Sequence, residues 1–506
     1  MKKKVLLFLL LGLFITSIRV YKLYDIPGEW FGDISNVHEY VEQILRGEWP
    51  FYFFQSPGPL YHYLIAPIAI IIRNEGYLKY KIASVLVSLA GIFSLYIFTK
   101  EVSDKKTAII SSLIMSFSFW YLIWSRIGNS QIVIPQLTAL MSFFLVKFLK
   151  NQKFIYLFFG TAVSSLGLYA YPQTYIFPAV YLLSVLLLLG IKKKIKCNYK
   201  NIFFILVFQL LFSLPFFMII TKQIDNFGPS GYIGQKVFPL KNMSLIQLIK
   251  KTALNYEKTL LMLHVKGHDS FRVNVPNHPQ LDRISGIMFF IGVLYFLSKR
   301  KITWLIYLII LLFILPIPSI LPAIPDGEIP NNGRTIALTA IVYIFVGAGA
   351  VFSNNLINKV SKNKLLGSTV IAILVAYICY SNLHFYFFRY APQLPDNNLG
   401  PSKIIAKYLD TYSNNYAIYF AECCWGGWGE PEPKAIMYQL KQKKKFILDN
   451  KIIEKCEDIT SFPAVIFYGS EEGTTKFDIT SCGKKYSNAQ ILSPDNLVVA
   501  NIKVVE

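Results

Sequence analysis

Charged residues are scarce in this chain: only 16% of its 506 residues are Asp, Glu, Lys or Arg, whereas 54% are hydrophobic. This composition excludes an intrinsically disordered chain, which is rich in charge and poor in hydrophobic residues. Cysteine is also rare, with six residues in the whole sequence, so a secreted disulfide scaffold is excluded. The hydrophobic runs are continuous and lack the apolar–polar alternation that a transmembrane β-barrel requires.

Long uncharged runs are the dominant feature that is present, and Val5–Ile15, Ile82–Phe98 and Leu305–Leu315 are three of them. They exclude a soluble α/β enzyme for most of the chain and predict an all-α polytopic membrane protein. We expect about eleven spanning helices, near residues 5–24, 78–99, 107–124, 131–149, 154–171, 174–190, 201–220, 284–297, 302–316, 334–352 and 365–386. The apolar segment Leu60–Ile72 is too short to span and predicts a re-entrant or interfacial helix.

The net charge of +22 is concentrated in short basic clusters between the hydrophobic runs. Lysine and arginine are enriched in cytoplasmic loops, so these clusters place the N-terminus in the cytoplasm and the C-terminus outside. Nucleic acid is not needed to explain the charge. The clusters are Lys2–Lys4, Lys100 with Lys105 and Lys106, Lys147 with Lys150 and Lys153, Lys192–Lys200, Lys299–Lys301, and Lys359 with Lys362 and Lys364.

Acidic residues before residue 390 have the opposite distribution. Only Glu101 and Asp104 fall in predicted cytoplasmic loops, and seven of the others lie between Asp25 and Glu75, in the first external loop. A cation transporter would more often place carboxylates within the bilayer. We therefore expect the chemistry at the outer membrane surface.

The composition changes at the end of the last predicted span. Residues 1–389 are predicted to form the transmembrane domain, and residues 390–506, with 13 basic and 14 acidic residues, a small extracytoplasmic α/β domain. Its predicted strands are Tyr416–Phe420, Ala464–Tyr468 and Leu497–Val504, and its predicted helices Ser402–Tyr412 and Lys434–Lys441. Four cysteines of this domain permit at least one disulfide, and the adjacent pair among them is poor spacing for zinc. They are Cys423, Cys424, Cys456 and Cys482.

The first external loop contains a candidate for catalysis. From Gly32 to Gly47 the apolar residues recur at helical spacing, with His38, Glu39, Glu42 and Gln43 predicted on the opposite face, so the segment predicts an amphipathic surface helix. Asp33 stands at the start of this helix. It is either an N-cap that accepts hydrogen bonds from the first amides, or an acid–base group at the membrane surface, and the two roles are compatible.

Two arginines lie at outer ends of predicted spans, where basic residues are otherwise depleted. Arg126 follows Trp124-Ser125, and Arg334 follows Asn332-Gly333. A guanidinium matches phosphate oxygens bidentately, so both are candidate phosphate ligands. The alternative is that each extends to lipid headgroups.

Other outer segments carry weaker signals. The turn Tyr169–Gln173 has aromatic residues that suit either a sugar or the interfacial aromatic belt. Ser244–His264 predicts a second surface helix, in a long loop that ends in Pro279-Gln280-Leu281-Asp282 before a span. His264, His268 and His278 have irregular spacing, and no HxH or HExxH pattern occurs. We therefore expect no metal site, and a divalent ion bound by these loops is the less favoured alternative.

Together these segments resemble the polyprenyl-phosphate-sugar-dependent glycosyltransferases of the GT-C membrane fold, in the branch of protein O-mannosyltransferases and aminoarabinose transferases. The resemblance runs from Asp33 through Pro57-Gly58-Pro59-Leu60 and the other outer segments to Gly333-Arg334, in the same order. It implies that Asp33 is the catalytic base; Ile34 stands where family members often have a second acid. We expect Arg126 and Arg334 to bind the donor phosphate. The residues expected to contact substrates are His38, Glu39, His62, Tyr171, Gln173 and Asp282.

The resemblance implies a mechanism and its partners. The donor is a sugar on a polyprenyl phosphate, and the acceptor is a hydroxyl of a lipid, glycan or protein. Asp33 takes the acceptor proton, the arginines stabilise the phosphate that leaves, and direct displacement inverts the anomeric carbon. No cofactor is implied, and the protein is expected in the cell membrane as a multi-pass chain.

Three alternatives fit the sequence less well. A lipid-linked saccharide transporter or flippase would need more polar residues within the bilayer. A non-catalytic anchor would not need eleven spans. An oligosaccharyltransferase would carry Trp-Trp-Asp-Tyr-Gly, whereas the external segment here reads Trp425-Gly426-Gly427-Trp428-Gly429.

Overall fold

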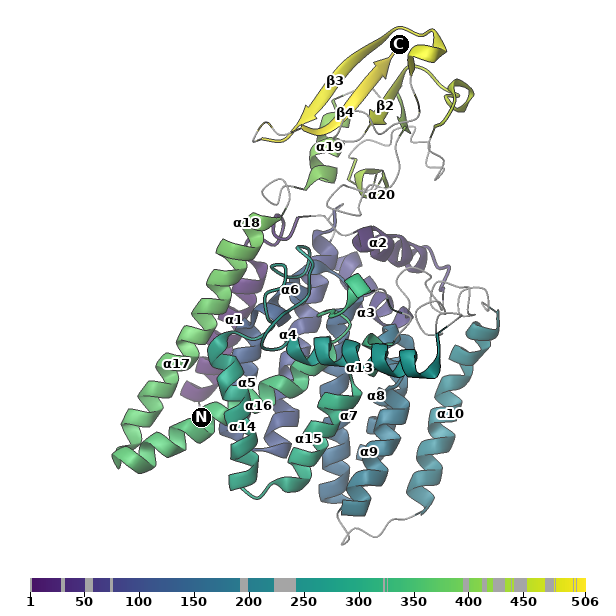
Figure 1. Ribbon diagram of the computed structural model, residues 1–506. Helices are drawn as coiled ribbons and strands as arrows, with labels where there is room; N and C mark the ends of the chain where they lie inside the picture. Colours follow the sequence, from purple (N-terminus) through teal and green to yellow (C-terminus); the bar gives the residue numbers. More distant parts are fainter. Residues whose placement is uncertain are drawn as a thin grey trace.

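The computed structural model describes residues 2–28, 32–50, 58–72, 76–191, 199–222, 243–321, 324, 326–394, 400–411, 416–421, 433–437, 439–440, 453–468, 477, 479–494, 496 and 498–506. Up to residue 394 the chain is helical, and most of its long helices run side by side (Figure 1). These helices are α1 (Lys2–Val20), α4 (Leu78–Val102), α5 (Lys105–Phe117), α6 (Phe119–Ile127), α7 (Ile134–Asn151), α8 (Phe154–Leu166), α9 (Phe177–Ile191), α10 (Tyr199–Lys222), α14 (Arg283–Ser298), α15 (Ile302–Ile314), α16 (Thr339–Ser361) and α17 (Lys364–Phe385).

The predicted polytopic architecture is confirmed. Within the described residues seven helical segments are long and apolar enough to cross a membrane, or eight if the bent pair α5–α6 is one span. Shorter apolar helices cover Leu10–Val20, Pro59–Ile71, Phe154–Tyr169 and Arg283–Ser298. A helix lies at each of the eleven predicted positions, and the number that cross the membrane stays a prediction.

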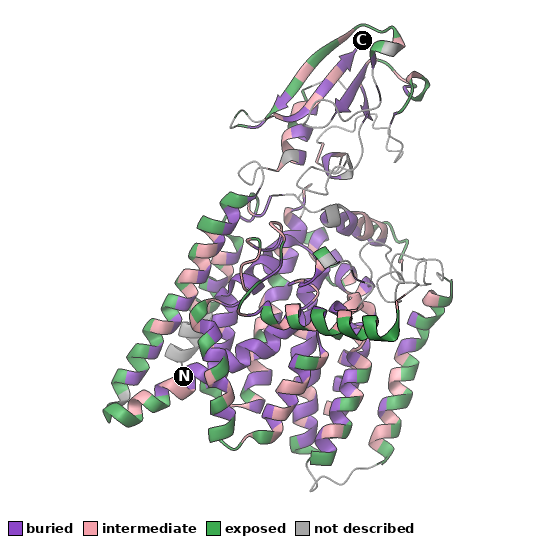
Figure 2. Cartoon of the chain, viewed as in Figure 1, coloured by how far each residue is buried: buried purple, intermediate pink, exposed green. Residues whose placement is uncertain are grey.

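Burial differs sharply between helices. The segment Ile336–Ser361, which contains α16, is almost entirely buried, whereas α10 and α17 expose most of their apolar side chains (Figure 2). A helix that is hydrophobic on all sides is buried in the centre of a bundle or faces lipid. The bundle therefore has α16 at its centre and lipid-facing helices at its periphery.

One predicted span is broken. The expected straight helix at 107–124 is the pair α5 and α6, which are bent by 60° at Ser118. Ser118 ends one helix and caps the next, with its hydroxyl accepting a hydrogen bond from the Tyr121 amide at 3.4 Å. The Phe119 amide donates to Asn382 Oδ1 of α17 at 2.8 Å, so a side chain replaces the missing helical acceptor.

Three further helices lie toward the end of the bundle that carries the C-terminal sheet, which the basic clusters predict to be the outer end (Figure 1): α2 (Gly32–Leu45), α3 (Pro59–Ile71) and α13 (Leu245–Leu261). Helix α13 confirms the predicted second surface helix and crosses the direction of the spans (Figure 1). It exposes Leu245, Ile246 and Ile249 and buries Asn255 and Thr259 against the protein. An apolar face turned outward is what a helix in contact with lipid requires.

The C-terminal part contains a four-stranded sheet in the order β1-β2-β4-β3. Strands β1 (Ala417–Phe420) and β2 (Ala464–Tyr468) are parallel, with Ala417 opposite Ala464, and β4 (Val498–Val505) is antiparallel to both β2 and β3 (Tyr486–Leu492). Helices α19 (Pro401–Leu409) and α20 (Pro433–Met437) lie at the predicted positions, although α20 ends early. The edge strand β3 was not predicted because its Ser487, Asn488 and Gln490 are polar and exposed.

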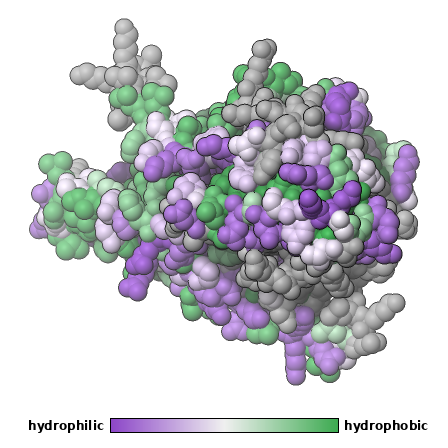
Figure 3. Space-filling model, turned by 90° about the horizontal axis from the view of Figure 1, so that it is seen from above, coloured by the Kyte–Doolittle hydropathy of each residue, from purple (hydrophilic) through white to green (hydrophobic). Residues whose placement is uncertain are grey.

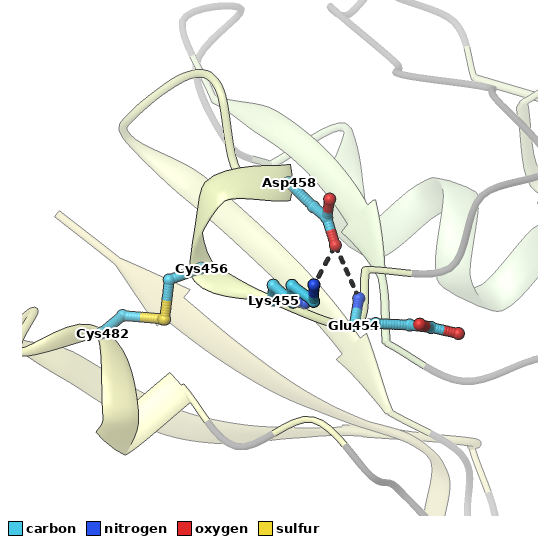
Figure 4. The surroundings of a disulfide bond; sticks show 5 residues. All are labelled: Glu454, Lys455, Cys456, Asp458 and Cys482. Carbon is cyan, nitrogen blue, oxygen red and sulfur yellow. Dashed lines mark hydrogen bonds between the residues drawn. A yellow bond between two sulfur atoms is a disulfide. The ribbon is translucent and has the colours of Figure 1, made fainter.

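A disulfide joins Cys456 and Cys482, whose Cα atoms are 5.4 Å apart (Figure 4). Beside it, Asp458 accepts hydrogen bonds from the amides of Glu454 and Lys455 at 2.8 and 2.9 Å. The prediction of at least one disulfide is confirmed. The other two cysteines of this domain, Cys423 and Cys424, lie outside the described residues.

The C-terminal sheet stands at the same end of the bundle as α2 (Figure 1). Lys403 of α19 donates to the Tyr24 carbonyl at 2.9 Å, and its ammonium also lies over the Tyr24 ring. Seen from above, hydrophilic and hydrophobic residues are mixed on this end (Figure 3). The helical segment after α17 continues to Gln393, and the domain boundary at 389/390 stays a prediction.

The distribution of basic clusters predicts that this end faces the outside. A cysteine introduced at the exposed Ser487 should react with a membrane-impermeant maleimide in intact cells, because β3 belongs to the external domain. A cysteine at Ser298, the last residue of α14, should react only after the membrane is opened. Labelling of the unmodified chain gives the background, and the reverse pattern would overturn the topology.

Candidate functional site

Helix α2, which begins at Gly32, is packed closely onto the bundle. Its Val37, Val41 and Ile44 are buried, as the amphipathic pattern predicts, and so is Ile34, whereas Leu45 at the end of the pattern is exposed. The prediction that His38 lies on the solvent face is wrong: it is buried, and its Nδ1 forms a 2.6 Å hydrogen bond with the Tyr80 hydroxyl. Burial, together with the charge of Lys79, lowers the pKa of His38 to about 3, so the imidazole is neutral at pH 7.

The first turn of α4 fixes this region through three consecutive residues. Lys79 forms an ion pair with Glu42 at 3.3 Å, Tyr80 binds His38, and Lys81 donates to the Pro27 carbonyl at 2.8 Å. Both lysines are almost fully buried. The sequence analysis did not identify these two lysines as functional residues. The available signal was their position at the predicted outer end of a span, where basic residues are depleted.

Asp33 occupies the first turn of α2, one residue after Gly32. Its side chain lies outside the described residues. Glu39, on the same helix, is half-buried. The role of Asp33 as the base stays a prediction, and its backbone position at the outer end of the bundle is compatible with that role.

Helix α3 brings His62 to α2. The His62 ring is fully buried, its Nδ1 lies 3.1 Å from the Gly58 carbonyl, and the Tyr40 ring meets it edge-on at 5.5 Å. Gly58, which precedes the helix, has a φ of 103°, and a Cβ there would lie 1.5 Å from the Ala170 carbonyl oxygen. Glycine is required at this position because the backbone of another segment passes so close.

That other segment is the predicted Tyr169–Gln173 turn, which is confirmed as two short 3-10 turns, η2 (Gly167–Tyr169) and η3 (Pro172–Thr174). Tyr171 and Gln173 are both half-buried. Gln173 Oε1 is buried and accepts no hydrogen bond in the part of the chain that is described. The turn therefore adjoins α3 and offers a buried acceptor.

The loop before α16 carries Arg334. Its guanidinium forms an ion pair with Glu328 through Nη2, while Nη1 is buried and donates to none of the described residues. Ser319, at the end of the turn η4 (Ile317–Ser319), donates to the Arg334 carbonyl at 3.1 Å, and η4 packs against η3. The Arg334 backbone is thus joined to η4, which packs against the turn η3 that carries Gln173.

A buried amide network supports this loop. Asn332 donates to the Val273 carbonyl at 2.7 Å and to Gln280 Oε1 at 3.3 Å, and its Oδ1 lies 3.2 Å from His268 Nδ1. Burial lowers the pKa of His268 to about 4, although its hydrogen bond with Asn332 opposes that effect. The network joins the 262–283 loop to the segment that carries Arg334.

Arg126 is arranged very differently from Arg334. It is fully buried, and its five N–H groups are all used: four donate to carbonyl oxygens and the Nε donates to the Tyr386 hydroxyl at 3.0 Å. The four carbonyls are those of Ile18, Arg19, Tyr21 and Ile26, at 2.6 to 3.0 Å. A guanidinium has five donors in total, so none remains for a phosphate. The structure thus gives no support to the predicted phosphate contact and assigns Arg126 to the outer end of α1.

Asp282 lies apart from the other candidates. It caps α14 by accepting hydrogen bonds from the Ser285 amide and hydroxyl at 2.9 and 2.6 Å, and it accepts a third from Asn382 of α17 at 2.9 Å. A cavity of about 320 Å³ adjoins it, lined by Phe119, His278 and Phe385 among others. The structure does not bring Asp282 to α2, and its substrate contact stays a prediction.

An apolar cavity of about 640 Å³ lies between the start of α3, η2 and α10. It begins next to the Gly58–Ala170 contact, and its lining is almost free of polar groups. Such a cavity suits a hydrocarbon chain. Its lining residues are Pro59, Leu60, Tyr63, Leu166, Tyr169, Leu211, Phe212 and Pro215.

Metal ligands do not gather in the described residues, where no group of three or more His, Cys, Asp or Glu side chains could hold an ion. His264, His268 and His278 each lie in a separate setting: the ring of His264 stacks on Phe290, and that of His278 packs on Phe385. The absence of a bound metal ion from the working protein therefore stays a prediction from the sequence.

The fold is the GT-C fold that the resemblance predicted, since the whole chain matches solved glycosyltransferases of that fold. It superposes on ArnT from Cupriavidus metallidurans in the apo state with a TM-score of 0.60 and 10% identity, over 100% of this chain and 98% of ArnT. ArnT bound to undecaprenyl phosphate matches with a TM-score of 0.57 and 9% identity, over 99% and 98%. The archaeal oligosaccharyltransferase AglB from Archaeoglobus fulgidus, in complex with an inhibitory peptide and a dolichol-phosphate, matches with a TM-score of 0.51 and 13% identity, over 98% and 74%.

A sequence family agrees with the fold over part of the chain. Residues 56–219 match the model of the dolichyl-phosphate-mannose-protein mannosyltransferases. This region runs from just before α3 to the end of α10, and so includes the apolar cavity and α6. No curated protein sequence matches the chain significantly.

The geometry of Arg126 predicts a structural effect of its substitution. Arg126→Lys should destabilise the protein by about 3 kcal/mol, because an ammonium replaces five hydrogen bonds with at most three and leaves buried carbonyls unpaired. Thermal unfolding in detergent measures this loss. Arg389→Lys, at an exposed arginine after α17, is the matched control and should leave the unfolding temperature unchanged. Unchanged stability with a weakened lipid-phosphate affinity would restore the phosphate role.

Proposed function

We propose that this protein is a membrane glycosyltransferase that moves a sugar from a polyprenyl phosphate to an acceptor hydroxyl at the outer membrane face. The observation that carries the proposal is the match of the whole chain to ArnT, which was crystallised with undecaprenyl phosphate. The match of residues 56–219 to the dolichyl-phosphate-mannose-protein mannosyltransferases supports the same class of donor.

The donor would occupy the neighbourhood of α3, η3 and Arg334. Its hydrocarbon chain fits the apolar cavity beside Pro59 and Tyr169. Its phosphate would be bound by Arg334, whose buried Nη1 has a donor to offer, and Gln173 Oε1 would accept from a sugar hydroxyl. In this proposal the hydrocarbon chain of the donor lies in the apolar cavity and its phosphate lies at the loop that carries Arg334.

Asp33 is the proposed general base. It would take the proton of the acceptor hydroxyl while that oxygen forms a bond to the anomeric carbon. The bond between this carbon and the phosphate oxygen breaks, and its electron pair leaves with the phosphate. One displacement inverts the anomeric configuration, and Arg334 stabilises the charge that collects on the phosphate.

The surroundings of α2 support a rigid base. Lys79 and Tyr80 hold the middle of the helix, and Lys81 holds the segment before it. A base that is fixed at the attack distance accelerates the reaction more than a mobile one, because its orientation costs no entropy in the transition state. We propose that Glu39 and His62 border the acceptor position without transferring the proton.

Replacement of the base should remove the chemistry. Asp33→Asn should lower kcat about 100- to 10,000-fold with the lipid-linked donor, because the amide cannot accept the proton. Unfolding temperature should not change. Asp25→Asn, at an exposed carboxylate of the same segment, should keep normal turnover. Normal turnover of Asp33→Asn would show that Asp33 has no role as the base.

Replacement of the phosphate ligand should affect binding. Arg334→Gln should raise the donor KM about tenfold or more, since a hydrogen bond to a charged group contributes about 1.5–3 kcal/mol. Glu328→Gln is the control, because it removes the ion-pair partner and keeps the guanidinium. A donor KM that is unchanged in Arg334→Gln would reject the phosphate contact.

A further inference from the structure

Trp124 of α6 lies against the loop that carries Arg334. Its ring is buried, with 5% of the residue exposed, and it packs on the backbone of Gly333. A Cβ on Gly333 would lie 2.3 Å from Trp124 Cζ2 and 3.2 Å from Cε2, the atom bonded to the indole nitrogen. Only glycine allows this approach, so the indole N–H is held beside the residue that precedes Arg334.

Two buried donors at this place have no acceptor. Trp124 Nε1 and Arg334 Nη1 are both inaccessible to solvent, and neither has a hydrogen-bond partner within the described ranges. Buried N–H groups are nearly always paired in folded proteins, because an unpaired one costs about 1–3 kcal/mol. Two such donors on adjacent segments are the arrangement expected of a site for an acceptor-rich ligand.

The neighbouring tryptophan provides an internal comparison. Trp120 lies one helical turn before Trp124, on the same face of α6, and its Nε1 donates to the Asn332 carbonyl at 2.8 Å. The two indoles therefore face the same loop, one with an acceptor and one without. Arg126, two residues beyond Trp124, points to the opposite side of the helix because each residue turns it by about 100°.

We propose that the Trp124 indole N–H is a second donor to the phosphate of the lipid-linked sugar, beside Arg334. This assignment rests on the proposed function. Phosphate oxygens accept several hydrogen bonds, so a neutral and a charged donor can bind one group together. The indole adds a directed bond without adding charge, in a place where Glu328 already balances Arg334.

The test is the removal of this single N–H. Trp124→Phe keeps an aromatic ring against Gly333 and loses the donor. The Kd for undecaprenyl phosphate, which carries no sugar, should rise about tenfold or more when measured by titration in detergent. The unfolding temperature of the unliganded protein should fall less than in Trp120→Phe, because both changes remove the same ring volume but Trp124→Phe leaves no acceptor unpaired.

Trp120→Phe is the matched control. It removes the same atom one turn away, where the N–H is already used. It should lower the unfolding temperature, because the buried Asn332 carbonyl loses its donor, and it should change the Kd for undecaprenyl phosphate less than Trp124→Phe does.

The outcomes separate the two proposals. Equal affinity of Trp124→Phe and the parent protein for undecaprenyl phosphate overturns the role of Trp124 and leaves the proposed function intact. A loss that occurs only with a sugar-bearing donor also overturns it, because the indole would then contact the sugar. If the parent protein neither binds a polyprenyl phosphate nor transfers from one, both proposals fail.

Discussion

A single buried guanidinium, that of Arg126, holds the outer ends of α1, α6 and α17 together. Its donors end on four backbone carbonyls at the end of α1 and in the connection that follows, and on the Tyr386 hydroxyl. The last carbonyls of a helix have no partners within the helix and carry partial negative charge, so a cation there satisfies them and the helix dipole. The last of these carbonyls, that of Ile26, lies six residues before α2 begins at Gly32.

The two sides of the short helix α6 contact different segments. One side presents Arg126 to the end of α1, and the other presents Trp120 and Trp124 to the loop that precedes α16. This division depends on the 60° bend at Ser118, which turns α6 away from the direction of α5. The Asn382 side chain, which accepts from the Phe119 amide, stabilises the bend and also binds Asp282. Asp282 is therefore linked to the start of α6 through Asn382, at a distance from α2.

The proposed donor site has a polar part and an apolar part on different segments. Arg334 and Gln173 lie on loops, and the apolar cavity lies between the start of α3, η2 and residues 211–215 of α10, a helix that is mostly exposed. The C-terminal domain stands over the same end and is tied to it by Lys403. A lipid-linked substrate would meet all three surfaces without leaving the membrane boundary.

Local patterns in the sequence determined the secondary structure and the membrane character. Hydrophobic runs place a helix at each expected span, the 3.6-residue period predicts α2, and even the disulfide-forming domain is visible from its composition. What lies opposite each polar side chain was decided only by the tertiary structure. His38 has the spacing of a solvent-facing residue and yet meets Tyr80, which is 42 residues later, and Arg126 has the position of a phosphate ligand and yet binds carbonyls about 100 residues earlier. Periodicity reports which face of a helix is apolar, whereas the partner of a buried donor depends on which distant segment brings a free carbonyl within hydrogen-bond distance.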